Sequence, residues 1–256
     1  MTKKIVVAGL DAFRRSLRDA MTQLDLDAFR TKPWFRGHSD VAYKLLPGLF
    51  RNDANPPEEW NMFAYFLNDG SSLLDRGINS WEALAFMQHH GLPTRLLDWS
   101  GSLQTALFFA TAHQFRRDEV PSSPCVWVMN PYQLNQISAR SKQHYVIYDE
   151  TDRISFDYLD SIRTGQWPRK MPVAIAAPWR NRRVMAQQGS FTAHGSDPRP
   201  IESIPALKGC IRRVDIDPAL VPAIREDLAI QGFNHFQAFP DLDGLAQRLR
   251  YQLMLR

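Results

Sequence analysis

The sequence predicts a single α+β domain that is built on a mixed or antiparallel central sheet and has helices at both ends of the chain. Apolar residues recur at helical spacing in residues 11–30 and again in residues 241–253. Between these helices lie three short runs that are expected to form strands. CVWVMN and VAIAAP are almost continuously apolar, which is typical of buried strands, and CIRRVDI is the third run. Helical and irregular segments separate the runs, so their order in the sheet stays open.

Local signals support each expected element in the first third of the chain. The helix over residues 11–30 can begin at Asp11, whose carboxylate is a good N-cap. After a proline, residues 34–37 are expected to form a short strand. Two prolines and two glutamates directly precede Trp60 and suit the first turn of a helix, which we expect over residues 57–75.

The middle of the chain predicts a helix, a strand and a second helix in close succession. The segment WEALAFMQHH should end at Gly91, a natural left-handed helix terminus, and Pro93 blocks its continuation. The run TRLLDW, residues 94–99, is strand-like. A helix is expected over residues 103–110, where apolar side chains recur at helical spacing.

The second half of the chain gives weaker signals. Residues 131–170 are polar and irregular, with a short helix expected near residues 155–163. Residues 182–195 mix strand and turn signals around a glycine. A helix is expected near residues 218–231, before the last helix that begins at Asp241.

The composition indicates a soluble cytoplasmic protein. Of the 256 residues, 44% are hydrophobic, which is enough apolar material to bury a core. Cys125 and Cys210 form no CxxC pair, so neither a disulfide framework nor a structural zinc site is expected. No apolar run is long enough for a signal peptide or a membrane-spanning helix, so we expect no membrane association. The motifs GxSxG, GxxxxGK[ST] and GxGxxG are absent, which removes support for a nucleophile elbow, a P-loop or a Rossmann fingerprint.

Arg36 is the first candidate for ligand binding. In WFRGHSD it follows two aromatic residues and precedes a glycine, so packing can hold its guanidinium while the backbone approaches a ligand. A planar guanidinium suits bidentate recognition of a phosphate or a carboxylate. The alternative is a structural arginine that pairs with an internal aspartate. His38 and Asp40 could form a general-base pair, although both are expected at the surface.

The segment QHHGLPTRLLDW is the second candidate. His89 and His90 end a helix, where the helix dipole favours a protonated imidazole. Asp98 precedes the next helix, whose N-terminal amides would stabilise its charge. Arg95 and Asp98 can also pair with each other across the strand. Adjacent helical residues point about 100° apart, which is poor geometry for shared metal ligation, and HExxH is absent, so no metal is expected.

The segment RNRRVMAQQGSFTAHG is the third candidate. Gln187 and Gln188 offer amide groups for recognition, Gly189 permits a bulge, and Phe191 could stack on a base or a nicotinamide ring. The alternative is an ordinary strand with a bulge. The net charge of +4 is too small to indicate nucleic-acid binding by itself, but the basic residues are clustered here. The arginines that could bind a phosphate-bearing partner, or simply form a solvated face, are Arg180, Arg182 and Arg183.

Together these motifs resemble the FRG-domain family, which is named for its Phe-Arg-Gly motif. The resemblance rests on WFRG, YKLLPGLFR, MQHHGLPTRLLDWSGSLQTALFFA, RRVMAQQGSFT and FPDLDGLA, which span residues 30–250. The long and unusual QHHGLPTRLLDW makes it specific. We therefore expect an N-terminal helical segment over residues 1–29 and an FRG domain over residues 30–256.

A weaker resemblance connects the chain to ADP-ribosyltransferases, and it implies a related fold with NAD as substrate. In those enzymes an Arg or His lies on a first strand, a helix follows a second strand, and a later strand bears a glutamate. Arg36, TRLLDWS with the helix that follows it, and AQQGSF resemble these three elements. Gln187 and Gln188 stand where the glutamate is expected, so Asp98 is the candidate to supply a carboxylate.

The resemblance implies an ADP-ribosyltransferase-like toxin or anti-phage effector that modifies RNA, DNA or a protein and that an antitoxin protein could control. It implies catalytic roles for Arg36, Asp98 and Gln188. The residues expected to contact NAD are Arg36, His90, Thr94, Arg95 and Phe191. The competing interpretation is a non-catalytic module that binds a nucleotide or RNA in the same cleft, because such a module needs no glutamate.

Overall fold

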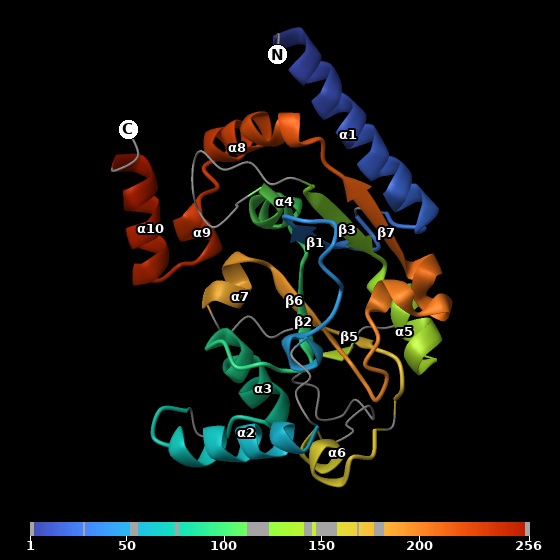
Figure 1. The fold of residues 1–256 in the computed structure, drawn as a ribbon, viewed down its shortest axis with the longest axis vertical. Coiled ribbons are helices and arrows are strands. Elements are labelled where there is room, and N and C mark those ends of the chain that lie inside the picture. Colours follow the sequence, from blue (N-terminus) through green and yellow to red (C-terminus); the bar gives the residue numbers. More distant parts are fainter. Residues whose placement is uncertain are drawn as a thin grey trace.

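The computed structural model describes residues 3–27, 29–51, 56–74, 77–111, 123–140, 145–146, 158–167, 169–176 and 182–253. The fold is α+β, as predicted, and a central sheet in the order β4-β5-β6-β2-β1-β3-β7 is surrounded by helices (Figure 1). The strands are β1 (Trp34–His38), β2 (Leu96–Ser100), β3 (Cys125–Met129), β4 (Tyr145–Val146), β5 (Val173–Ala176), β6 (Gly189–Ala193) and β7 (Ile211–Asp215).

Helices lie at both ends of the chain and between the strands. The helices are α1 (Lys3–Gln23), α2 (Pro56–Asp69), α3 (Ser80–His89), α4 (Leu103–Thr111), α5 (Pro131–Ala139), α6 (Tyr158–Thr164), α7 (Arg182–Ala186), α8 (Val221–Ile230), α9 (His235–Ala238) and α10 (Leu242–Leu253). Short 3-10 helices are η1 (Gly48–Phe50), η2 (Ile201–Ser203), η3 (Pro205–Cys210) and η4 (Pro218–Leu220). In the described part of the chain, no helix has both the length and the apolar character that crossing a bilayer requires.

The sheet is mixed, because β4 and β5 run parallel while the other neighbouring strands run antiparallel. It consists of two well-paired parts that meet at a weak junction. β1 pairs with β3 along its whole length, and β2 pairs with β6 along its whole length. By contrast, β1 and β2 are in register at one pair, Phe35 opposite Ser100. The two parts therefore separate beyond this pair, which opens the sheet next to Arg36 and Asp98.

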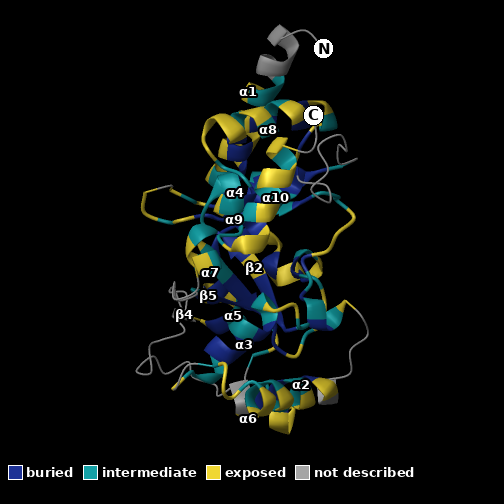
Figure 2. Ribbon diagram, turned by 90° about the vertical axis from the view of Figure 1, so that its left-hand side faces the viewer, coloured by how far each residue is buried: buried dark blue, intermediate teal, exposed yellow. Residues whose placement is uncertain are grey.

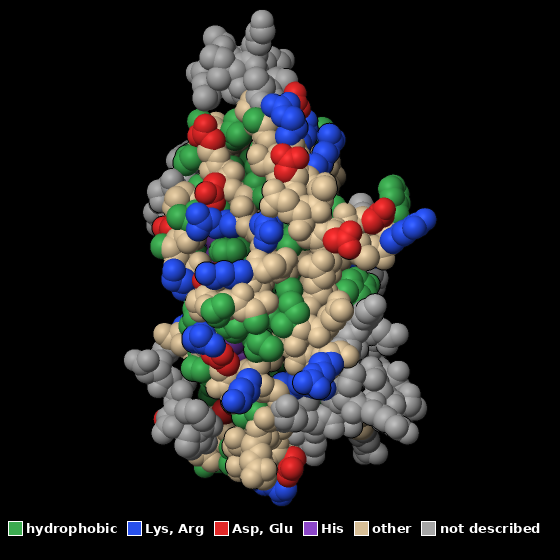
Figure 3. All heavy atoms as spheres, turned by 90° about the vertical axis from the view of Figure 1, so that its right-hand side faces the viewer, with side chains coloured by type: hydrophobic (Ala, Val, Ile, Leu, Met, Phe, Trp, Pro, Cys, Tyr) green, Lys and Arg blue, Asp and Glu red, His purple; other side chains and the backbone are tan. Residues whose placement is uncertain are grey.

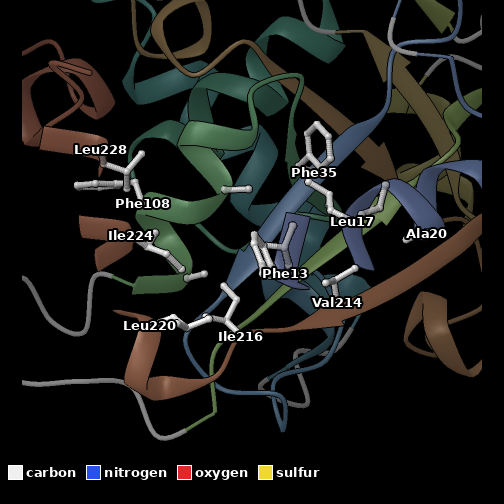
Figure 4. Close-up of a cluster of buried hydrophobic side chains, with 14 of the residues drawn as sticks. Phe13, Leu17, Ala20, Phe35, Phe108, Val214, Ile216, Leu220, Ile224 and Leu228 are labelled. Atoms are coloured by element: carbon white, nitrogen blue, oxygen red, sulfur yellow. The ribbon is translucent and has the colours of Figure 1, made fainter. Parts of the chain in front are cut away.

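The first part of the sheet shares its core with helices from both ends of the chain. Phe13 of α1, Phe35 of β1, Phe108 of α4, Val214 of β7 and Ile224 of α8 belong to one buried cluster (Figure 4). The N-terminal helix α1 thus shares one buried cluster with α8, which comes from the last part of the chain. Burial of these side chains fixes the position of α4, which lies in the middle of the cluster.

The second part of the sheet has its own core. Phe63 of α2, Leu84 of α3, Leu96 of β2, Ile175 of β5 and Phe191 of β6 are buried together. Figure 2 shows this buried interior as a dark band along β2 and β5, with the more exposed helices outside it. The predicted buried strands CVWVMN and VAIAAP are β3 and β5, and β3 is buried at all five positions.

Three local predictions were wrong. The first helix begins at Lys3, so Asp11 lies within α1 instead of capping it. The region predicted to be irregular contains α5, which begins after Asn130. The side chain of Asn130 caps this helix, because it accepts hydrogen bonds from the backbone N–H groups of Tyr132 and Gln133. Residues 182–186, expected to be strand or turn, form the short helix α7, and β6 starts only at Gly189.

Gly37 explains the glycine of the WFRG segment. A Cβ atom at this position would lie 1.8 Å from the backbone oxygen of Ala106 and 2.7 Å from the backbone nitrogen of Ala110. The backbone of α4 therefore lies directly on β1, and only a residue without a side chain allows this approach. This contact places α4 beside the junction between β1 and β2.

We expect Gly37→Ala to destabilise the protein by about 3 kcal/mol or more, because the added methyl group meets backbone that cannot rotate away. The measurement is the free energy of unfolding in urea, followed by circular dichroism. Gly209→Ala is the matched control, since a Cβ at Gly209 meets nothing within 4 Å. Equal stability of the two variants would contradict the proposed contact between β1 and α4.

Candidate functional site

A cavity of about 650 Å³ opens where β1 and β2 separate. Residues of β1, β2, α4 and the segment 39–51 line it, together with two residues from α7 and the turn that follows. Its volume lies within the range of about 300–1,000 Å³ that is usual for small-molecule and cofactor sites. The aromatic side chains of the lining are Phe35, Tyr43, Phe50, Trp99 and Phe109.

The charged side chains of the lining are mostly basic. Arg36, Lys44, Arg51 and Arg183 line the cavity, and Asp98 is the carboxylate among the lining residues. Such an excess of positive charge in a concave site attracts phosphate-bearing anions. Among the described residues, no group of three or more His, Cys, Asp or Glu side chains could hold a metal ion.

Basic residues also occur outside the cavity, but they do not gather in one place on the surface seen in Figure 3. On this face, which carries α1, β7 and α5, Lys and Arg side chains are spread from top to bottom with acidic side chains among them. The cavity thus differs from this surface in combining basic groups, aromatic rings and partial burial at one position.

Arg36 bridges the separated strands. Its Nε donates a hydrogen bond to Nε2 of His38 (3.1 Å), and its Nη1 donates to the backbone oxygen of Asp98 (2.6 Å). The guanidinium thus satisfies a carbonyl of β2 at a position where β1 and β2 are no longer paired in register. Burial lowers the pKa of Arg36 to about 10, and Asp98 partly opposes this shift, so the guanidinium stays charged at neutral pH. Nη2 of the Arg36 guanidinium has no hydrogen-bond partner among the described residues and is available to a ligand.

His38 is a neutral hydrogen-bond acceptor for Arg36. Contrary to the prediction that it lies at the surface, His38 is 5% exposed. Burial, with Arg36 and Arg51 nearby, lowers the pKa of His38 to about 3, so the ring is neutral at physiological pH. Because Nε2 accepts from Arg36, the ring proton belongs on Nδ1. Asp40 bonds instead to Ser123 and to the backbone of Ala42, so the two side chains form no general-base pair.

Asp98 is positioned by a chain of side-chain hydrogen bonds within QHHGLPTRLLDW. Thr94 donates through its hydroxyl to Oε1 of Gln88, and Nε2 of Gln88 donates to Oδ1 of Asp98 (2.7 Å). Oδ2 of Asp98 lies 3.8 Å from Nη1 of Arg36. The Asp98 side chain is nevertheless 60% exposed, so the carboxylate is oriented and still accessible from the cavity. Asp98 lies within β2, and Ser102 instead accepts a bond at the start of α4.

Arg95 is buried and does not line the cavity, and its contacts hold the start of β2 in place. It forms an ion pair with Glu59 through Nε (2.8 Å) and Nη2, and its Nη1 donates to the backbone oxygens of His194 and Gly195 (2.7 and 2.9 Å). Its guanidinium carbon lies 3.4 Å from the ring centroid of Trp167. Arg95 therefore pairs with Glu59 and not with Asp98, and these contacts fix the start of β2.

Thr94, His90, Gln188 and Phe191 do not line the main cavity. Thr94 is buried and acts through Gln88. His90 is exposed at the end of α3. Gln188 adopts a positive φ of 46° at the turn before β6, and it is the preceding glutamine that lines the cavity. Phe191 is 5% exposed in the second core.

A smaller pocket of about 60 Å³ adjoins the cavity and shares Asp98 and Arg183 with it. Phe191, Gln88 and His89 line this pocket, so Phe191 is adjacent to the site although it is not within the main cavity. Burial, followed by the nearby charge of Arg183, lowers the pKa of His89. For His89 this shift opposes the protonated imidazole that the helix end was expected to favour.

The arginine cluster is only partly at the site. Arg183 lines both pockets, and its guanidinium carbon lies 4.7 Å from the ring centroid of Phe239. Arg182, its neighbour on α7, is exposed to solvent. Arg180 lies outside the described residues. Gln187, which also lines the cavity, is held by a bond from its Nε2 to the backbone oxygen of Ala238 (2.8 Å).

Sequence reasoning missed four residues that build the site. Gln88 was visible as the first letter of QHHGLPTRLLDW, but nothing in the sequence indicated that it contacts Asp98 ten residues later. Lys44 and Arg51 flank a proline-glycine turn, and only the tertiary structure brings them into one cavity with β1 and β2. Glu59 was used only as a sign of a helix start, and nothing in the sequence linked it to its partner Arg95, which is 36 residues away.

These observations define the class of protein: an α+β domain with a cationic, aromatic-lined cavity at a split in its sheet. The family model of the FRG domain matches residues 31–119, and the chain therefore carries an FRG domain. The matched region begins just before β1 and contains Arg36, Gly37, Gln88 and Asp98. No curated protein and no solved structure matches the chain. That the domain extends over residues 30–256 stays a prediction, although β3 to β7 belong to the same sheet.

The buried Glu59–Arg95 pair leads to a prediction about stability. Arg95→Met leaves the Glu59 carboxylate buried without its partner, and we expect a loss of about 3–5 kcal/mol in the free energy of unfolding. The double variant Glu59→Leu, Arg95→Met should recover part of this loss, because it removes both charges. Arg163→Met, which removes an exposed pair with Asp160, is the control and should leave stability nearly unchanged. A small effect of Arg95→Met would show that the pair does not support β2.

The low pKa of His38 predicts a loss of stability in acid. Between pH 6.5 and about 3 the unfolded chain binds a proton at His38 that the folded protein does not bind, so stability falls as the pH falls through this range. The contribution of this one residue is about 1.4 kcal/mol per pH unit, or about 2 kcal/mol at pH 5. His38→Gln keeps an acceptor for Arg36 and should make the decline shallower in urea unfolding between pH 7 and pH 4. Equal slopes for the two proteins would refute the neutral, buried state of His38.

Proposed function

We propose that the cavity between β1 and β2 binds NAD and that the domain transfers ADP-ribose from NAD to a macromolecular acceptor. The observation that supports this most is Arg36, whose guanidinium is held by His38 and a β2 carbonyl while its Nη2 side remains available. A preorganised fork of this kind suits the NAD pyrophosphate. Lys44 and Arg51 add positive charge, and the cavity volume is in the range of cofactor sites.

The reaction needs a bond to break at C1′ of the ribose next to nicotinamide. The electron pair of this C–N bond goes to the ring nitrogen, which leaves as neutral nicotinamide and creates an oxocarbenium-like centre at C1′. A lone pair of the acceptor then forms the new bond to C1′, and the acceptor proton passes to a carboxylate or to water. A nearby negative group stabilises the positive charge that develops.

In this proposal Asp98 supplies the carboxylate that a glutamate provides in ADP-ribosyltransferases. Gln88 orients it through Oδ1, and Thr94 in turn holds Gln88. Gln187 replaces Gln188 as the glutamine that faces the bound molecule. Arg95 and Thr94 become positioning residues, and His90 and Phe191 lie outside the main cavity. Exposed Arg182 and cavity-lining Arg183 are suited to a phosphate-bearing acceptor.

A non-catalytic module that binds a nucleotide or RNA is the second candidate, and one observation favours it. The carboxylate of Asp98 already accepts a bond from Gln88 and faces Arg36, so its charge is partly compensated. A carboxylate whose charge is already compensated stabilises a cationic transition state less well. The biological role belongs to the transferase proposal and rests on the resemblance alone. It is that of a toxin or an anti-phage effector, with RNA, DNA or a protein as acceptor and an antitoxin protein as partner.

The first experiment is titration calorimetry with NAD. The protein should bind NAD, and Arg36→Ala should weaken binding at least tenfold, because two charge-assisted hydrogen bonds to the pyrophosphate are lost. Arg36→Lys tests the fork itself and should recover little of the affinity. Lys208→Ala removes an exposed charge from η3 and is the control. Absence of NAD binding by the folded wild-type protein would overturn the proposal.

Nicotinamide release separates catalysis from binding. Asp98→Asn keeps the size of the side chain and should still bind NAD, but it should release nicotinamide at least a hundredfold more slowly, by analogy with loss of one charge-stabilising group. Chromatographic measurement of nicotinamide, with candidate RNA, DNA and protein acceptors added in turn, gives the rate. NAD binding without any release by the wild type would favour the binding module.

A further inference from the structure

A second cavity of about 240 Å³ lies at the C-terminal end of α4, among α8, α9 and α10. Figure 1 shows these three helices grouped around α4 at one end of the molecule. Phe108 and Thr111 of α4 line this cavity, whereas Thr105, Ala106 and Phe109 line the cavity at the strand split. The two cavities therefore lie on different faces of the same helix and share no lining residue.

The second cavity is positively charged. Arg225 and Arg248 line it, and no Asp or Glu is among its lining residues. Arg225 is already engaged, since its Nε (3.0 Å) and Nη2 donate to the backbone oxygen of Thr111. Burial lowers the pKa of His235, so this ring enters the cavity uncharged. The positive charge therefore comes from the two guanidinium groups.

Arg248 provides the strongest indication of a missing anion. Its Nε is buried and has no hydrogen-bond partner among the described residues. A buried donor on a charged group without an acceptor is costly and rare in folded proteins. An anion in the cavity would supply the acceptor and offset the charge of Arg225 as well.

The remaining wall is aromatic. The ring of Phe108 packs edge-on against His235 with centroids 5.1 Å apart, and it lies 5.7 Å from the ring of Phe233. The ring of Tyr251 lies 5.6 Å from that of His235. Such a wall favours a planar ring. An apolar cavity of about 150 Å³ accepts benzene, so 240 Å³ has room for one ring and a carboxylate.

We propose that this cavity is a second ligand site, which binds a small aromatic carboxylate. The ring lies among Phe108, Phe233 and Tyr251, and the carboxylate accepts hydrogen bonds from Arg248 and faces Arg225. This inference is independent of NAD binding at the first cavity, because none of its residues belongs to that site.

The test compares benzoate with benzamide, which has nearly the same shape but no charge. Binding to the full chain is measured by titration calorimetry or by ligand-observed NMR. We expect benzoate to bind at least tenfold more tightly than benzamide. Equal affinity of the two, or no binding of benzoate, would overturn the proposal without any variant.

Variants then locate the site. Arg248→Met should lose the preference for benzoate, while Arg250→Met, an exposed neighbour on α10 outside the lining, should keep it. Arg36→Ala should also keep it, because Arg36 lines only the first cavity. Loss of benzoate binding in Arg36→Ala, with binding retained in Arg248→Met, would place benzoate in the first cavity and refute the second site.

Discussion

The hydrogen bond from Arg36 to the backbone of Asp98 is the interaction on which the site depends. Two well-paired parts of the sheet meet at the single registered pair Phe35–Ser100, and beyond it the strands separate. A split of this kind leaves backbone groups without strand partners, which is unfavourable unless another donor replaces them. Arg36 provides that donor from β1 to β2. The same side chain that stabilises the opening therefore also presents a charged fork within it.

The surroundings of Arg36 explain why the opening does not collapse. Gly37 lets the backbone of α4 lie on β1, so the helix forms one wall of the cavity instead of filling it. On the other side, the buried ion pair of Arg95 with Glu59 fixes the start of β2, and the bonds among Thr94, Gln88 and Asp98 fix its accessible carboxylate. A site preorganised in this way needs little rearrangement when a ligand binds.

The charges around two arginines, Arg36 and Arg95, give the same kind of side chain two different roles. Arg95 and Arg36 are both largely buried arginines, but Arg95 is neutralised by Glu59 within the core, whereas Arg36 faces a cavity that has an excess of basic side chains. His38 is kept neutral by burial and serves as an acceptor. The second cavity has the same character on a smaller scale, with two arginines and aromatic rings but no carboxylate in its lining. In both cavities the excess of positive charge over negative charge, and not the number of polar groups, indicates an anionic ligand.

The sequence by itself determined the fold class, the buried strands β3 and β5, the αL end at Gly91 and the importance of WFRG and QHHGLPTRLLDW, because these depend on periodicity and on local backbone chemistry. It did not reveal α5 or α7, since their short amphipathic patterns are ambiguous in polar segments. Only the tertiary structure decided which arginine faces the cavity and which is paired in the core. That choice depends on Glu59 meeting Arg95 and on β1 separating from β2, and such contacts between distant residues leave no trace in local spacing.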